Sequence, residues 1–80
     1  MNGLLFIDDE EGVRRSILRA LKNEPYKTYA AENGEKGIEF IKQNISEIVT
    51  VISDYKMPGL DGLETLSIIG SINPEITRIY

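Results

Sequence analysis

The chain has 80 residues, a formal net charge of −4 at pH 7 and a hydrophobic share of 41%. This length and composition indicate one small folded domain and argue against a disordered chain. The acidic balance and the lack of a basic stripe argue against direct nucleic-acid binding. Cysteine and histidine are both absent. Disulfides and thiolate or imidazole metal sites are therefore excluded, and a bound metal would be a hard cation with oxygen ligands.

Localisation is predicted from what the sequence lacks. No apolar run approaches the roughly 20 residues needed to span a membrane. A predicted strand follows Met1 almost directly, which leaves no room for a signal peptide. We therefore expect a soluble, cytoplasmic protein.

The first part of the chain predicts a strand, a helix and a second strand. Residues 4–7 are a short continuous apolar run, as in a strand buried on both faces. Residues 11–23 carry apolar residues at helical spacing with basic residues towards the end, and Pro25 closes this helix. Residues 26–31 alternate loosely and predict a shorter edge strand. The apolar face of the helix comprises Val13, Ile17, Leu18 and Leu21.

The middle of the chain repeats the alternation. A turn signal at Asn33-Gly34 precedes a second helix with an isoleucine face. Gly37 inside this helix costs up to ~1 kcal/mol relative to alanine, so we expect the helix backbone to approach a sheet closely there. Residues 48–52 are rich in β-branched side chains and predict a second buried strand. The isoleucine face comprises Ile38, Ile41 and Ile45, with Phe40 beside them.

The end of the chain completes the pattern with a third helix, stopped before Pro74, and a fourth strand over residues 76–80. Alternating strands and helices predict an α/β fold, a doubly wound parallel sheet with right-handed crossovers and helices on both faces. Strands 4–7 and 48–52 should be adjacent and central, with 26–31 beside the first. The apolar residues of the third helix are Leu63, Leu66 and Ile69.

Three carboxylates follow the two central strands. Asp8 and Asp9 end the first, and Asp54 ends the other, at the edge where open α/β sheets bind ligands. A pair of carboxylates at ~4 Å costs about 4 kcal/mol at an effective dielectric near 20, which indicates a bound cation. Oxygen ligands with room for water suit Mg²⁺. A carboxylate beside such an ion can also act as a nucleophile towards a phosphoryl group.

Helix capping is the alternative role for some of these acids. Asp9 or Glu10 could serve only as the N-cap of the helix over residues 11–23. Asp61 is best explained as the cap of the helix beginning near Leu63. Asp54 is harder to explain in this way, because no predicted helix starts directly after it.

Three stretches resemble a known family. "LLFIDDE" (4–10) and "SDYKMPGLDG" (53–62) are similar to the motifs of the receiver domain of two-component response regulators. "AAENGEKGIEFI" (30–41) resembles that family's second strand, turn and second helix. The resemblance implies a flavodoxin-like fold and a signalling module, rather than a turnover enzyme. Such a module accepts a phosphoryl group from a sensor histidine kinase or phosphotransfer protein.

The same resemblance implies a role for each site residue. Asp54 would be the phosphoacceptor. Asp9 would ligate Mg²⁺ directly, Asp8 directly or through water, and the backbone carbonyl of Tyr55 would supply a further ligand. The loop over the site would be shaped by Pro58 and Gly59.

The sequence departs from the family at its end. Receiver domains have five strands and five helices, so we expect residues 1–80 to be a truncated receiver domain with an incomplete sheet. The family's switch hydroxyl and its lysine have no counterparts, and Lys56 is a poor substitute because its loop position should point it outward. We therefore expect weak Mg²⁺ binding and impaired phosphorylation.

The truncation also predicts self-association, by edge pairing or by exchange of the C-terminal strand, because an uncovered strand edge invites another chain. Ile68 and Ile72 add apolar surface where a solvated helix would carry charge. An inactive, self-associating structural module is therefore the alternative function. A Mg²⁺-dependent aspartyl phosphatase is a further candidate, but such enzymes need a second acid two residues after the nucleophile, where this chain has Lys56.

Overall fold

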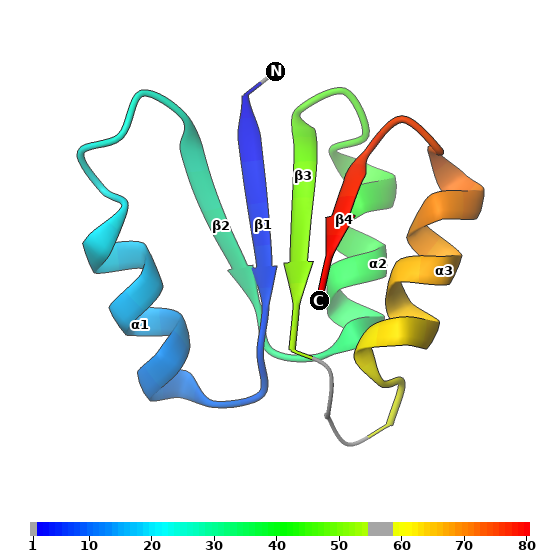
Figure 1. The fold of residues 1–80 in the computed structure, drawn as a ribbon, viewed down its shortest axis with the longest axis horizontal. Coiled ribbons are helices and arrows are strands. Elements are labelled where there is room, and N and C mark those ends of the chain that lie inside the picture. Colours follow the sequence, from blue (N-terminus) through cyan, green and yellow to red (C-terminus); the bar gives the residue numbers. More distant parts are fainter. Residues whose placement is uncertain (1, 55–58) are drawn as a thin grey trace.

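The computed structural model describes residues 2–54 and 59–80, which form a four-stranded parallel sheet and three helices (Figure 1). The predicted order of alternating strands and helices is confirmed. No helix within these ranges is both long and apolar enough to cross a membrane. The strands are β1 (Gly3–Ile7), β2 (Lys27–Ala31), β3 (Ile48–Ser53) and β4 (Thr77–Ile79). The helices are α1 (Glu11–Ala20), α2 (Gly34–Gln43) and α3 (Gly62–Ile72).

The strand order in the sheet is β2-β1-β3-β4, with all neighbours parallel. β1 and β3 are therefore adjacent and central, and β2 flanks β1 at an edge, as predicted. Ile7 pairs with Ser53 at the carboxyl ends of the central strands. The residues that follow these two strands consequently start from the same edge of the sheet.

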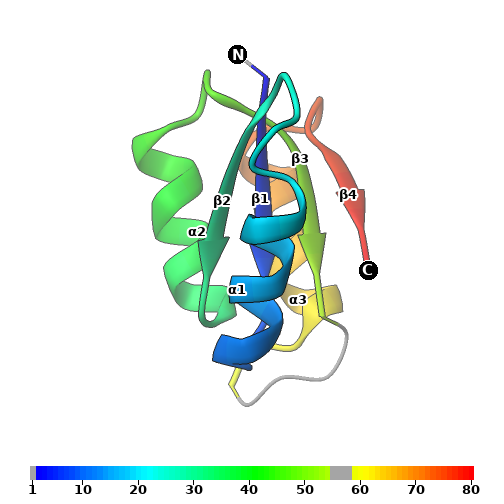
Figure 2. The ribbon, with the colours of Figure 1, turned by 90° about the vertical axis from the view of Figure 1, so that its left-hand side faces the viewer.

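The helices cover the two faces of the sheet unequally. α2 and α3 pack against each other on one face, α2 over β1 and β2, and α3 over β3 and β4. α1 lies on the opposite side of the sheet from them and packs mainly against β2 (Figures 1 and 2). This arrangement is the doubly wound α/β architecture that the alternation predicts.

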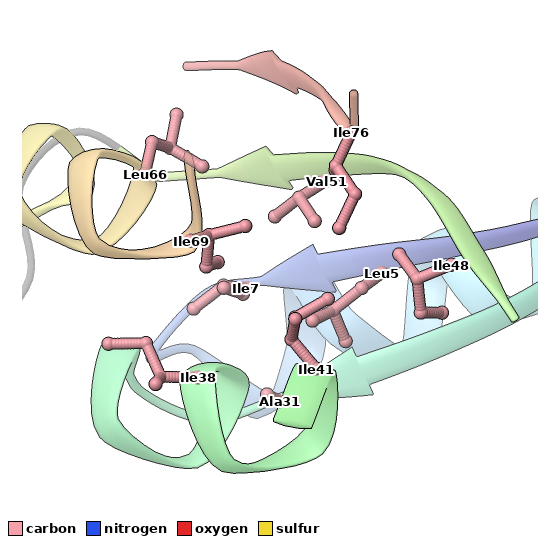
Figure 3. Packing of buried hydrophobic residues seen from close by; sticks show 10 residues of the cluster. All are labelled: Leu5, Ile7, Ala31, Ile38, Ile41, Ile48, Val51, Leu66, Ile69 and Ile76. Atoms are coloured by element: carbon pink, nitrogen blue, oxygen red, sulfur yellow. The ribbon is translucent and has the colours of Figure 1, made fainter. Parts of the chain in front are cut away.

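The hydrophobic core lies between the sheet and the pair α2 and α3 (Figure 3). Gly37 faces this core, and a Cβ at that position would meet Ile7 Cδ1. The expected close approach of the helix backbone to the sheet is therefore confirmed. The largest fully buried side chains are Leu5, Ile7 and Val51 from the sheet and Ile41, Thr65 and Ile69 from the helices.

Some predicted elements end earlier than the sequence pattern suggests. The first helix ends at Ala20, and beyond it the Glu24 N–H bonds the Leu21 carbonyl in a turn. The placement of Ile45 on the isoleucine face is wrong: it lies beyond α2 and is 44% exposed. There the Asn44 side chain donates to the Phe40 carbonyl at the helix end (2.9 Å).

Candidate metal site at the carboxyl ends of the strands

The backbone of the two central strands brings the predicted acidic residues together. The Asp54 N–H donates to the Ile7 carbonyl (2.8 Å), so the β1–β3 pairing continues up to the acid. The Asp8 N–H donates to the Ala31 carbonyl (3.1 Å), which ties the end of β1 to the end of β2. Asp8 and Asp54 are therefore held by the sheet itself rather than by a loop.

One carboxylate oxygen from each of Asp8, Asp9 and Asp54 lies within 4.8 Å of the other two. Asp8 is buried, with 7% of its surface exposed, whereas Asp54 is half-buried and Asp9 is exposed. Like charges at this spacing repel one another, at a cost of about 4 kcal/mol per pair at an effective dielectric near 20. A divalent cation among three oxygens would convert this repulsion into binding energy. The convergence predicted from the sequence is confirmed.

Asp8 is the most constrained of the three acids. Its Oδ1 accepts a hydrogen bond from the Glu10 N–H (2.9 Å), and its backbone carbonyl accepts one from Arg14 Nη1 (2.7 Å). Glu10 occupies the N-cap position of α1, but its side chain makes no capping bond. The capping alternative for Glu10 is therefore wrong, and Asp9 lies one residue before the cap position.

Arg14 is a residue near the site that sequence reasoning missed. It lies within the basic helical stretch, where it is indistinguishable by type from its neighbour Arg15. One signal was available, because cations are unfavourable near a helix N-terminus, and Arg14 is the fourth residue of α1. A local conflict of this kind often marks a functional position.

The end of β2 adds a fourth acid, Glu32, near the same edge. Its pKa lies below the ordinary value of 4.5, first because Lys36 Nζ donates a hydrogen bond to the carboxylate and carries a positive charge. The charge of Arg14 contributes further to the lowering. The hydrogen bond joins Lys36 Nζ to Glu32 Oε1 at 2.7 Å. Glu32 is thus engaged by a cation of its own.

The loop after β3 is described only from Gly59 onwards. Tyr55 and Pro58, to which the resemblance assigns a metal ligand and a loop-shaping role, lie outside the described residues. Lys56, the poor substitute for the family's lysine, lies outside them as well. Gly59 has φ +79°, a conformation that favours glycine. The predicted role of Gly59 in shaping the loop is therefore compatible with its backbone.

Asp61 serves as the helix cap that the sequence predicts. Its side chain accepts a hydrogen bond from the Glu64 N–H (2.8 Å), and the Glu64 side chain accepts one from the Asp61 N–H (3.3 Å). This reciprocal pair is a capping box. Asp61 therefore has a structural role at the start of α3.

The chain is similar in sequence to proteins of two-component signalling. It is 30% identical over 76 residues to the sporulation initiation phosphotransferase F of Bacillus subtilis, which covers 95% of this chain and 60% of that protein. It is 31% identical over 77 residues to the sensor kinase CckA of Brucella abortus, over 96% of this chain and 8% of the kinase. The chain thus spans three-fifths or less of these two relatives.

Solved structures show the same fold. A response regulator receiver domain protein from Clostridium thermocellum matches with a TM-score of 0.91 and 29% identity, over 98% of this chain and 62% of that one. Another match is a crystal structure of the histidine kinase ThkA in complex with the response regulator protein TrrA. It has a TM-score of 0.78 and 34% identity, covering 98% of this chain and 66% of that one.

The family model described as the response regulator receiver domain matches residues 4–80. This match extends over almost the whole chain and includes both strand ends that carry the clustered carboxylates. The chain belongs to the response regulator receiver domain family.

Proposed function

We propose that residues 1–80 act as one phosphoacceptor unit of a two-component response regulator, and not as a turnover enzyme. In this proposal Asp54 receives the phosphoryl group. Asp8, Asp9, Asp54 and the backbone carbonyl of Tyr55 bind Mg²⁺. The observation that supports it most directly is the convergence of three carboxylate oxygens within 4.8 Å of one another.

The residues of the site fit the proposed ion. Mg²⁺ takes hard oxygen ligands and keeps several waters, so two or three carboxylates at an open edge suit it. Asp8 and Asp54 are held by backbone hydrogen bonds to neighbouring strands, so their positions depend little on whether an ion is bound. When bound, Mg²⁺ would offset the negative charge of an incoming phosphoryl group.

Asp54 is suited to act as the nucleophile because it is held rigidly but only half-buried. In the proposed transfer one of its carboxylate oxygens attacks the phosphorus of a phosphohistidine. The P–O bond forms as the P–N bond breaks, and the imidazole nitrogen keeps the electron pair. The product is an aspartyl phosphate.

The proposed phosphodonor is a sensor histidine kinase or phosphotransfer protein in the cytoplasm. Support comes from the similarity to a chain in the crystal structure of the histidine kinase ThkA in complex with the response regulator protein TrrA. The net charge of −4 makes direct binding of nucleic acid by this segment unfavourable.

The metal site is tested by titrating Mg²⁺ while recording amide chemical shifts. We expect saturable shifts at Asp8, Asp9 and Asp54, and their loss in Asp9→Asn, which removes one charged ligand. Asp61→Asn is a matched control, because it removes one negative charge from outside the acidic cluster but keeps an oxygen for the helix cap. If Mg²⁺ leaves the wild-type spectrum unchanged, the proposed metal site is wrong.

Phosphorylation is tested with a small phosphodonor such as acetyl phosphate in the presence of Mg²⁺. Because we propose that phosphorylation is impaired in this chain, we expect slow and incomplete labelling, seen as a hydroxylamine-labile mass increase of one phosphoryl group. This labelling should be absent in Asp54→Asn and retained in Asp61→Asn. Labelling that survives Asp54→Asn would contradict the assignment of the phosphoacceptor.

Self-association is the second proposal, and β4 is the observation that favours it. All three residues of this edge strand are exposed, and Ile79 is 47% exposed. An exposed edge strand carries unpaired backbone N–H and C=O groups, which can pair with a second copy of the chain. We expect light scattering to give a mass that rises with protein concentration, and less so in Ile79→Lys, which places a charge on the edge. A monodisperse monomer at high concentration would contradict this proposal.

A further inference from the structure

Arg14 connects helix α1 to the end of β1, where Asp8 and Asp9 follow the strand. Its Nη1 donates to the backbone carbonyl of Asp8 at 2.7 Å. That carbonyl belongs to the peptide group that joins Asp8 to Asp9. The hydrogen bond therefore acts on the peptide that sets the direction of the exposed Asp9 side chain.

Two other polar groups of Asp8 are also engaged. Its N–H bonds the Ala31 carbonyl (3.1 Å), and its Oδ1 accepts the Glu10 N–H (2.9 Å). With the bond from Arg14, the backbone before and after Asp8 is held from β2 and from α1. The Asp9 side chain is exposed. Holding the peptide between Asp8 and Asp9 is therefore a way to control the position of that side chain.

The neighbouring Arg15 shows that this geometry is specific to Arg14. Arg15 Nη2 pairs with Glu11 Oε2 at 3.2 Å, and the two side chains are 72% and 66% exposed. Arg14 is half-buried and bonds a backbone carbonyl. A guanidinium on a carbonyl leaves the carboxylate oxygens available to an ion, whereas a guanidinium on a carboxylate would compete with the ion for them.

We infer that Arg14 is a positioning residue for the metal site: it holds the Asp8–Asp9 peptide so that the Asp9 carboxylate stays near Asp8 and Asp54. This inference rests on the proposed Mg²⁺ site. Residues that orient metal ligands without touching the metal commonly contribute about 10- to 100-fold to metal affinity.

The charge of Arg14 and its proposed positioning role predict opposite changes in Mg²⁺ affinity when Arg14 is replaced. Removing a positive charge close to the acids should strengthen the attraction for a cation. Removing the hydrogen bond should weaken binding, because Asp9 then has to be ordered when the ion binds. The sign of the change in affinity therefore separates the two effects.

The experiment measures the dissociation constant for Mg²⁺ by amide chemical shifts in wild type, Arg14→Met and Arg15→Met. Both variants lose one positive charge and keep a long side chain. We expect Arg14→Met to bind about tenfold more weakly, and Arg15→Met to bind as tightly as wild type or slightly more tightly. Equal or tighter binding by Arg14→Met would overturn the inference while leaving the metal site intact. A wild-type chain that does not respond to Mg²⁺ would instead overturn the metal site, and the inference with it.

Arg14→Lys keeps the charge and one hydrogen-bond donor, so it distinguishes positioning from general damage to the fold. We expect this variant to recover most of the wild-type affinity. In the metal-free protein, the Asp9 amide resonance should shift in Arg14→Met and return towards its wild-type position in Arg14→Lys. Arg14→Met and Arg14→Lys could instead lose Mg²⁺ affinity equally and melt at the same lowered temperature. In that case Arg14 contributes only packing and the inference is wrong.

Discussion

The two faces of the sheet differ in how completely their helices are buried. On one face, α2 and α3 contribute fully buried side chains, including Ile41 and Ile69. On the other, α1 has an apolar stripe at the same helical spacing, yet none of its residues is buried. Leu18, within that stripe, is 37% exposed.

The difference shows that an amphipathic pattern sets the orientation of a helix but not the depth of its burial. α2 and α3 contact each other as well as the sheet, whereas α1 packs mainly against the edge strand β2. Burial requires neighbours on several sides, and the apolar area removed from water determines the stabilisation. Packing on the α2 and α3 face should therefore dominate the stability of this chain.

The largest expected effect comes from truncating a side chain on the covered face. Ile41→Ala should lower the free energy of unfolding by about 2–5 kcal/mol, because it leaves a cavity in a closely packed core. Ile17→Ala on α1 removes the same atoms from a half-buried position and should cost less than half as much. Urea unfolding followed by circular dichroism measures both. Equal losses would contradict the contrast between the faces.

Two glycine-to-alanine substitutions should give the next largest changes in stability, and the two changes should have opposite signs. Gly37→Ala places a Cβ against Ile7 in the core and should destabilise the protein by about 1–3 kcal/mol through overpacking. Gly12, in α1, has nothing within 4 Å of its would-be Cβ. Gly12→Ala should stabilise by about 0.5–1 kcal/mol through improved helix propensity. Thermal unfolding of the two variants tests the sign of each change.

A smaller effect is expected at Thr65, which is fully buried on the α3 side. Among the described residues its Oγ1 has no hydrogen-bond partner, and a buried unpaired hydroxyl costs about 1–3 kcal/mol. Thr65→Val keeps the shape and should raise the free energy of unfolding by about 1 kcal/mol. The matched Thr77→Val, on exposed β4, should change it by less than about 0.5 kcal/mol. A loss of stability in Thr65→Val would mean that the hydroxyl is satisfied.

The smallest effect concerns the ion pair at the start of α2. The pKa of Glu32 is lowered in the folded state by its hydrogen bond to Lys36. Its contribution to stability is therefore present above the ordinary value of 4.5 and is lost as the pH falls through the lower folded value. The stability difference between wild type and Glu32→Gln should be constant near neutral pH and vanish in acid. A stability difference between these two proteins that persists at low pH would contradict the role of the charged Glu32 carboxylate.

Much of the fold was predictable from local patterns. The apolar run before Asp8 and the β-branched run before Asp54 identified the two central strands. Because parallel strands end at the same edge, the meeting of their acids followed without further information. The cap at Asp61 was also predictable, since an N-cap acid with Glu64 three residues later is a local signal. Ile45 was misplaced because the pattern continues past the point where Asn44 ends the helix.

The part of the site that could not be predicted involves contacts between elements. Arg14 and Arg15 are alike in residue type, and their directions on α1 decide which of them reaches the Asp8 carbonyl. The unequal exposure of Asp8 and Asp9 likewise depends on how the chain turns after β1.

By itself, the sequence determined the order of strands and helices, the edge of the sheet where the acids gather and the family to which the chain is similar. These properties follow from periodicity, strand polarity and short motifs, all of which are local. Only the tertiary structure decided which helix is deeply buried, which glycine touches the core and which arginine bonds the Asp8–Asp9 peptide. Those outcomes depend on the neighbours that each residue meets across the sheet, and such neighbours lie far apart along the chain.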